Sequence, residues 1–161
     1  MVVVRSYQFS EAVREVVEII RTHQNLNLVI EAPLSIAFDI NGNPKGRNVE
    51  YIDNKYRYWH TGPGAVVSLA SLIFMKRLLD SKPFNTISLF EGLVSFKSKT
   101  RRSNHEEDVL ALKRAIMSQS PARIPEPHRR AKGDTVESIF NVIGHDLGIP
   151  PVIEGGKNGN T

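Results

Sequence analysis

Carboxylates recur in this sequence at positions where apolar runs end. Glu31 follows the apolar run at residues 28–30, and Glu91 follows the run at residues 87–90. A third acidic group, residues 105–108, opens a segment with helical spacing. Removing a carboxylate from water is costly, so its repeated placement beside buried strands needs a reason. The usual reasons are a metal site and a strand end that reaches solvent.

A metal site would use these residue types directly. In a parallel sheet Glu31 and Glu91 would emerge at the same edge, and a helix starting just after that edge would bring residues 105–108 towards them. Carboxylates from separate elements are the ligands that Mg²⁺ and Mn²⁺ prefer. Two such ions about 4 Å apart activate a water and stabilise the leaving oxygen in phosphodiester cleavage.

Simpler explanations stay open for part of this set. Acidic residues in a first helical turn complement the helix dipole, so residues 105–108 could form only a helix start. His105 could be a ligand or a proton shuttle, although a single histidine in a first turn is more often exposed. For Glu31 the solvent explanation is weaker, because its neighbours on both sides are apolar.

The elements that must position these residues alternate between strand and helix. Apolar runs without alternation predict strands, and apolar residues at helical spacing between polar ones predict helices. We expect an α/β fold with a mainly parallel sheet flanked by helices. The predicted strands are residues 2–4, 28–30 and 86–90, and the predicted helices begin at Ser10, Gly64, residues 103–106 and residues 134–137.

Side-chain patterns predict how three of these helices pack. The helix at residues 64–80 is apolar on most sides and should be the most buried. The other two should turn the inner stripes Val109, Leu112, Ile116 and Ile139, Ile143, Leu147 towards the core.

The organisation of the chain indicates one α/β domain over residues 1–153. Residues 33–63 form a long aromatic and basic loop, residues 119–133 a proline-rich basic linker, and residues 154–161 a disordered tail. Aromatic side chains interleaved with cations suit base stacking and phosphate pairing, although the aromatics could equally anchor the loop on the core. The candidate nucleic-acid contacts are Lys45, Arg47, Arg57, Trp59, Lys97, Lys99, Arg101 and Arg102.

Composition limits the partners. The 161 residues carry a formal charge of +4 at pH 7, which favours a polyanion such as nucleic acid. With no cysteine, any metal must be bound by oxygen or imidazole, and the chain suits a reducing cytoplasm. The longest apolar stretch, residues 65–79, is interrupted by Ser68, Ser71, Lys76 and Arg77, so we expect no membrane partner.

Residues 29–35, 89–97 and 104–112 resemble the later half of the ribonuclease H-like superfamily, particularly its RuvC-like predicted nucleases. The resemblance implies that Glu31 matches the acid after the fourth strand, and that Asp108 matches the acid of the last helix, with His105 three residues before it. It implies Mg²⁺ or Mn²⁺ bound by Glu31 and Asp108, and a supporting role for Glu91 and His105. The family's first strand, with its aspartate, has no counterpart before Val2.

Three functions follow as hypotheses. The first is metal-dependent phosphodiester hydrolysis of nucleic acid by a Mg²⁺-dependent nuclease, or a degenerate relative of one. The second is a non-catalytic nucleic-acid-binding or assembly module that uses the basic loop and linker, and whose affinity falls steeply with salt. The third is an enzyme acting on a small phosphate ester. An incomplete sheet also predicts a homodimer or a partner that completes it.

Overall fold

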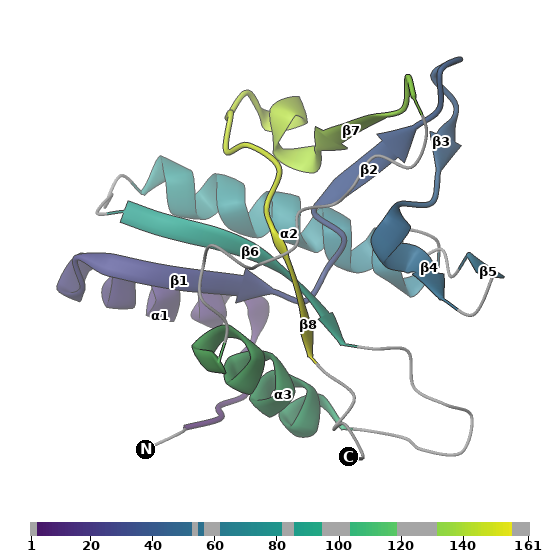
Figure 1. The fold of residues 1–161 in the computed structure, drawn as a ribbon. Coiled ribbons are helices and arrows are strands. Elements are labelled where there is room, and N and C mark those ends of the chain that lie inside the picture. Colours follow the sequence, from purple (N-terminus) through teal and green to yellow (C-terminus); the bar gives the residue numbers. More distant parts are fainter. Residues whose placement is uncertain are drawn as a thin grey trace.

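The computed structural model describes residues 3–52, 55–56, 62–81, 86–94, 104–118 and 132–155. Its centre is a parallel sheet of three strands in the order β1-β6-β8, flanked by helices (Figure 1). The strands are β1 (Asn25–Ile30), β6 (Thr86–Val94) and β8 (Val152–Gly155). This confirms the predicted α/β class with a parallel sheet.

Two of the predicted strands are present and one is not. β1 and β6 include the predicted runs and extend beyond them, so Glu91 lies within β6 instead of after it. Residues 3–8 form neither helix nor strand, and the third parallel strand is β8. The prediction for residues 2–4 was wrong for residues 3 and 4, because β-branched residues favour a strand only where a neighbouring strand can pair with them.

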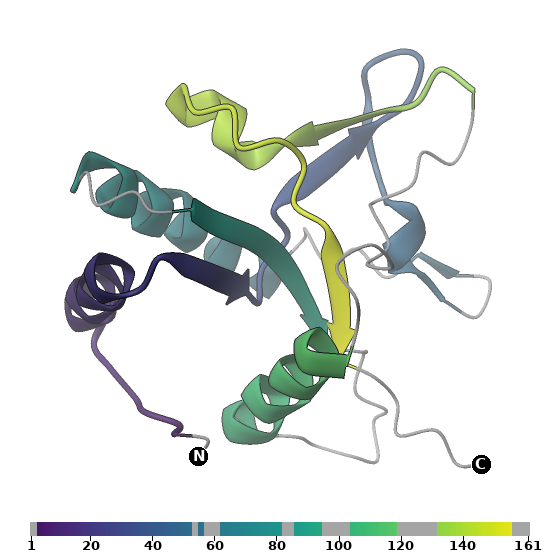
Figure 2. The ribbon, with the colours of Figure 1, turned by 60° about the vertical axis from the view of Figure 1, so that its left-hand side comes forward.

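The helices cover both faces of the parallel sheet. α1 (Phe9–Thr22) and α2 (Pro63–Asp80) pack on one face, and α3 (His105–Ser118) packs on the other (Figure 2). Apolar side chains alternate between the two faces along each strand. The buried residues of the larger core are Val13, Val17, Ile20, Ala32, Leu34, Met75, Leu78 and Phe140, and those of the smaller core are Phe90, Ala115 and Ile153.

Helix α1 confirms the apolar spacing that predicted it. Val13, Val17 and Ile20 are its buried residues, at a spacing that puts them on one stripe. Its N-cap is Gln8 and not Ser10, and the Gln8 N–H donates to Glu11 Oε2 at 3.1 Å. The helix therefore begins earlier than the serine alone predicts.

Helix α2 has the predicted length and is, as predicted, the most buried of the three described α-helices, because it has the largest share of buried and half-buried residues. Its buried residues are Gly64, Ser71, Met75 and Leu78. The molecule nevertheless covers only one side of α2, and Val66 is 68% exposed, Leu69 62% and Ile73 51%. An apolar composition on every side shows what a helix can bury and not what the fold provides to cover it.

Helix α3 lies close to the sheet because β6 and β8 carry glycines beneath it. A Cβ on Gly92 would lie 2.8 Å from Leu112 Cδ1 and 3.1 Å from Val29 Cγ1. Leu112 is buried as predicted and Ile116 packs against the smaller core, but Val109 is about half exposed, which corrects its place on the inner stripe. The first turn is capped by Asn104, whose Oδ1 accepts the Glu107 N–H at 2.8 Å.

The region predicted as a long loop contains regular structure. β2 (Ser35–Phe38) lies between β3 (Pro44–Lys45) and β7 (Thr135–Ser138) in a separate antiparallel sheet. A 3₁₀ turn at Asn48–Glu50 and the short strands β4 (Tyr51–Ile52) and β5 (Lys55–Tyr56) follow. The loop prediction was wrong here, since two- to four-residue strands are too short to give a periodic signal.

The predicted helix after Asp134 is also corrected. Residues 135–138 form β7, in which Val136 and Ser138 are buried and Thr135 and Glu137 exposed. A short 3₁₀ helix, η3 (Ile139–Ile143), follows and ends at Gly144 with φ +75°. An acid at each end of residues 134–137 resembles a helix start. Pairing with β2 instead provides hydrogen-bond partners for the backbone of these residues and buries alternate side chains.

Some predictions fall on residues outside the described ranges. They are the linker at 119–131, the tail at 156–161 and part of the loop at 53–61. Glu154 and Gly155, which were assigned to the tail, belong to β8. None of the described helices is long and apolar enough to cross a membrane.

Candidate carboxylate site at the edge of the parallel sheet

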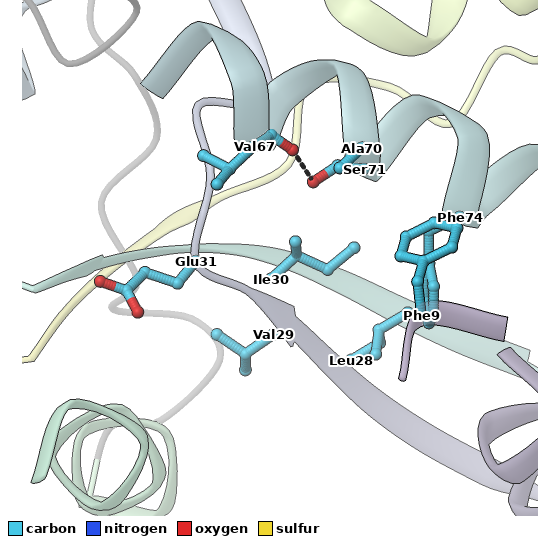
Figure 3. A pocket seen from close by; sticks show the side chains of 9 residues that line it. All are labelled: Phe9, Leu28, Val29, Ile30, Glu31, Val67, Ala70, Ser71 and Phe74. Carbon is cyan, nitrogen blue, oxygen red and sulfur yellow. Dashed lines mark hydrogen bonds between the residues drawn. The ribbon is translucent and has the colours of Figure 1, made fainter. Parts of the chain in front are cut away.

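Glu31 stands directly after β1, at the carboxyl end of this strand. The strand pairs with β6 in parallel, with Ile30 opposite Glu91. Glu31 is half-buried and borders an apolar groove (Figure 3). Figure 3 shows its carboxylate turned away from the apolar side chains of that groove. The position therefore lets a carboxylate leave the edge strand of the sheet without lying in the core.

Glu91 has a different environment, although it lies in the neighbouring strand. Its side chain is fully buried and accepts two hydrogen bonds from the Arg47 guanidinium, Nη1 to Oε2 and Nη2 to Oε1, both at 2.7 Å. The Leu34 N–H also donates to Oε2 at 2.8 Å. Burial raises the pKa of Glu91, and the bonds from Arg47 and Leu34 oppose that rise.

Arg47 joins three segments of the chain. Besides Glu91, its guanidinium donates to Ser35 Oγ at 2.8 Å and to Glu50 Oε1 at 3.1 Å. Its own N–H donates to Glu50 Oε2 at 2.9 Å. Burial lowers the pKa of Arg47, but the two glutamates outweigh burial and raise it, so the guanidinium is charged.

This buried network fixes the backbone just beyond Glu31. Leu34 and Ser35 are attached to Glu91 and Arg47, and a planar bidentate pair permits little rotation. Glu91 therefore acts on the candidate site through the segment that follows Glu31. Its carboxylate oxygens are occupied by Arg47 and Leu34, which makes it a positioning residue and not a free metal ligand.

Asp108 differs from the other acidic residues of its helical turn. It is 2% exposed, whereas His105, Glu106 and Glu107 are exposed. It lies one turn before Leu112, the residue that packs over Gly92 and Val29. Exposed first-turn acids complement the helix dipole, but a buried one bears a desolvation cost that the dipole alone offsets only in part. Burial thus separates Asp108 from the residues that only start the helix.

A metal centre built from this chain would have few protein ligands. The described part of the chain contains no group of three or more His, Cys, Asp or Glu side chains able to hold an ion. Glu31 directly follows β1 and Asp108 lies in the first turn of α3, and both side chains offer carboxylate oxygens. Such a pair matches the sparse protein coordination that Mg²⁺ accepts when water and substrate oxygens complete it.

The predicted nucleic-acid contacts are corrected at two positions. Arg47 is 1% exposed and ion-paired within the protein, so it cannot present a cation to a phosphate. Lys45 is partly buried, and its Nζ lies 2.6 Å from Asp134 Oδ2. The other predicted contacts lie outside the described residues, namely Arg57, Trp59, Lys97, Lys99, Arg101 and Arg102.

Little in the sequence signals the Arg47 network directly. Arg47 and Glu91 are 44 positions apart, and Arg47 stands among other basic residues that suggest a surface loop. The one local signal is Glu50, three residues after Arg47, whose carboxylate accepts a hydrogen bond from the Arg47 N–H. Comparison of the chain with protein-family models, curated proteins and solved structures gave no match.

Proposed function

We propose that this chain is a ribonuclease H-like, RuvC-like domain whose function is Mg²⁺- or Mn²⁺-dependent hydrolysis of nucleic-acid phosphodiesters, or that it descends from such a nuclease. Glu31 and Asp108 are the metal ligands in this proposal, Glu91 positions Glu31, and His105 assists. The observation that carries it is the placement of two carboxylates, Glu31, which is half-buried after β1, and Asp108, which is buried on α3. The third carboxylate, Glu91, is ion-paired with Arg47.

The donor set fits the proposed ion. Both ligands are carboxylates, and Mg²⁺ commonly binds through one or two carboxylates together with substrate phosphate oxygens. When bound, the metal supplies an activated water and stabilises charge on the phosphate. In this proposal the ion lies beside the buried Asp108 carboxylate, where a positive charge stabilises the ionised form.

The chain's own residues prepare this site before any ligand arrives. Arg47 pairs with Glu91 inside the protein, so the charge of Glu91 is balanced and repels a neighbouring carboxylate less than an unpaired charge would. The bonds from Leu34 and Ser35 into this network hold the segment that follows Glu31. His105 is exposed at the start of α3.

The test measures cleavage and metal binding in the same variants. Single-stranded, duplex and branched nucleic acids are incubated with Mn²⁺ or Mg²⁺, and Mn²⁺ affinity is measured by calorimetry without substrate. We expect Glu31→Gln and Asp108→Asn each to abolish cleavage and weaken Mn²⁺ binding about tenfold or more. Glu91→Gln should weaken Mn²⁺ binding within the range of about 10–100-fold that is typical of residues supporting a ligand.

The matched control is Glu107→Gln, which removes an exposed acid from the same turn as Asp108. It should leave cleavage and Mn²⁺ affinity unchanged, and circular dichroism should show all variants folded. Cleavage that survives both Glu31→Gln and Asp108→Asn would contradict the assignment. Nucleic-acid binding that needs no divalent ion and weakens steeply with salt, without any cleavage, would favour the non-catalytic binding module instead.

A further inference from the structure

The outer edge of β1 is open. β1 pairs with β6 on one side, and within the described residues no strand pairs with its other side. Figures 1 and 2 both show β1 at the border of the sheet, with its free edge facing away from β6. The edge therefore presents unpaired backbone N–H and C=O groups, which are a template for another strand.

The edge carries none of the usual protection against pairing. Residues 25–30 read Asn-Leu-Asn-Leu-Val-Ile, with no charge and no proline. Natural edge strands are commonly blocked by lysine, proline, a bulge or a covering segment. An edge of six residues without such devices is a site at which association is expected.

An apolar groove lies beside this edge. Its volume is about 330 Å³, and Phe9 of α1, residues 28–31, and Val67, Ala70, Ser71 and Phe74 of α2 line it. Figure 3 shows Leu28 and Ile30 of β1 beneath the α2 residues, with Phe9 and Phe74 at one end. A strand added here would gain backbone hydrogen bonds from β1 and apolar contacts from the groove.

The chain itself carries a segment of matching chemistry. Residues 3–7 are Val-Val-Arg-Ser-Tyr, and Val3 is 55% exposed and Val4 38% exposed. No backbone hydrogen bond joins residues 3–7 to the rest of the described chain. Valine and tyrosine favour strands, so this segment has strand propensity without a partner. Within its own molecule it leaves α1 below β1 and does not enter the sheet (Figures 1 and 2).

We propose that a second copy of this chain binds the open edge, by adding residues 3–7 of its N-terminal segment to β1 as a strand. Reciprocal exchange would bury both open edges in a closed two-fold dimer, with two identical strand additions. Charge favours the same occupant, since the segment carries Arg5 and the end of β1 carries Glu31. Arg5 now makes an exposed ion pair with Glu15 and an exposed hydrogen bond to the Tyr7 hydroxyl, both at 3.3 Å, and exposed contacts of this kind cost little to break.

The surrounding surface supplies further apolar area to such a dimer. Val66, Leu69 and Ile73 lie along the same helix as the groove residues of α2 and are exposed. Stable interfaces bury about 1,200–2,000 Å² in total, and two exchanged segments count twice towards that area. The exchange does not rest on the nuclease proposal, because the edge backbone of β1 and the apolar groove carry it, and the charge of Glu31 only adds to the attraction of Arg5.

The first test is oligomeric state by sedimentation of the full chain over a range of micromolar concentrations. We expect a dimer for the native chain, and a shift of at least tenfold towards monomer for the double variant Val3→Asp/Val4→Asp. The matched control is Val142→Asp, which places the same charge on a valine that is 77% exposed in η3. A native chain that is monomeric throughout, or a dimer that the double variant leaves intact, would overturn the proposal.

The second test uses the absence of cysteine from the chain. Separate Val4→Cys and Asn27→Cys variants are mixed and oxidised, and disulfide-linked dimers are identified by mass. Strand exchange predicts a disulfide between the Val4→Cys chain and the Asn27→Cys chain, because Asn27 is an exposed residue of β1. The Val142→Cys variant mixed with Asn27→Cys should give far less. Equal yields from the two mixtures would contradict strand addition. A Glu31→Gln variant that loses nuclease activity but still forms the dimer would support strand addition as separate from the nuclease function.

Discussion

Glu31 directly follows β1 and Glu91 lies in the neighbouring strand β6 at nearly the same level of the sheet, yet their surroundings are opposite. Glu91 is enclosed, and Arg47 and the Leu34 N–H occupy its oxygens. Glu31 borders a groove at the open side of the sheet. The difference arises because β6 has neighbours on both sides, whereas β1 is the border strand. Two glutamates that end similar apolar runs can therefore be a structural anchor and a candidate ligand.

The difference between the two glutamates depends first on Arg47, and removal of the Arg47 side chain should have the largest effect on stability. Arg47→Met leaves Glu91 and Glu50 buried without their shared cation, so we expect a loss of about 3–5 kcal/mol in the free energy of unfolding. Urea denaturation measures this loss. Arg21→Met is the control, since it breaks an exposed pair with Glu18 and should change stability by about 0.5 kcal/mol or less. Equal losses in the two variants would show that the enclosed network contributes no special stability.

The second prediction compares the two glutamates directly. Glu91→Gln keeps the shape of the side chain but removes a charge from the pair with Arg47, which should cost about 1–3 kcal/mol. Glu31→Gln alters a half-buried residue beside the groove and should cost less than about 1 kcal/mol. Both free energies come from the same denaturation experiment. A larger loss for Glu31→Gln would reverse the assignment of anchor and ligand.

The third prediction concerns the hairpin that carries the chain from Glu31 to Arg47. Asp39 accepts hydrogen bonds from the Asn41 and Asn43 N–H groups at 2.8 and 2.9 Å. The Asn43 bond is the main cause that lowers the pKa of Asp39 below its usual range, with burial opposing. A lowered pKa in the folded state contributes stability above the ordinary aspartate pKa, and this stability disappears as the pH falls through the lowered pKa.

Asp39→Asn should therefore lower the melting temperature slightly near neutral pH, and the difference from the native chain should shrink in acid. Thermal unfolding followed by circular dichroism between about pH 7 and pH 2 measures it. Asp146, whose carboxylate accepts the Gly148 N–H at 3.1 Å, offers a comparison turn remote from Arg47. If Asp39→Asn destabilises equally at all pH values, the ionised form of Asp39 is not what stabilises the hairpin.

Elements with strong periodic patterns could be predicted from the sequence. In five elements the apolar residues recur at a regular spacing over several residues, so the local sequence alone indicates a helix or a strand. These elements are α1, α2, α3, β1 and β6. β2 and β7 could not be predicted, because each is four residues long and its strand form depends on pairing with the other, about 100 positions away. The same reason explains why Asp134 to Glu137 resembled a helix start.

For the candidate site, the sequence determined that Glu31 would stand at the end of a parallel strand and that Asp108 would lie in the first turn of a helix, whereas the expected burial of that strand was wrong because β1 is the border strand. Those placements follow from local apolar patterns and capping residues. Only the tertiary structure decided that Arg47 is an internal cation, that Glu91 is its partner, and that Asp108 is buried while its neighbours are exposed. A buried charge needs a partner that is close in space, and spacing along the chain does not determine which distant residue will be that partner.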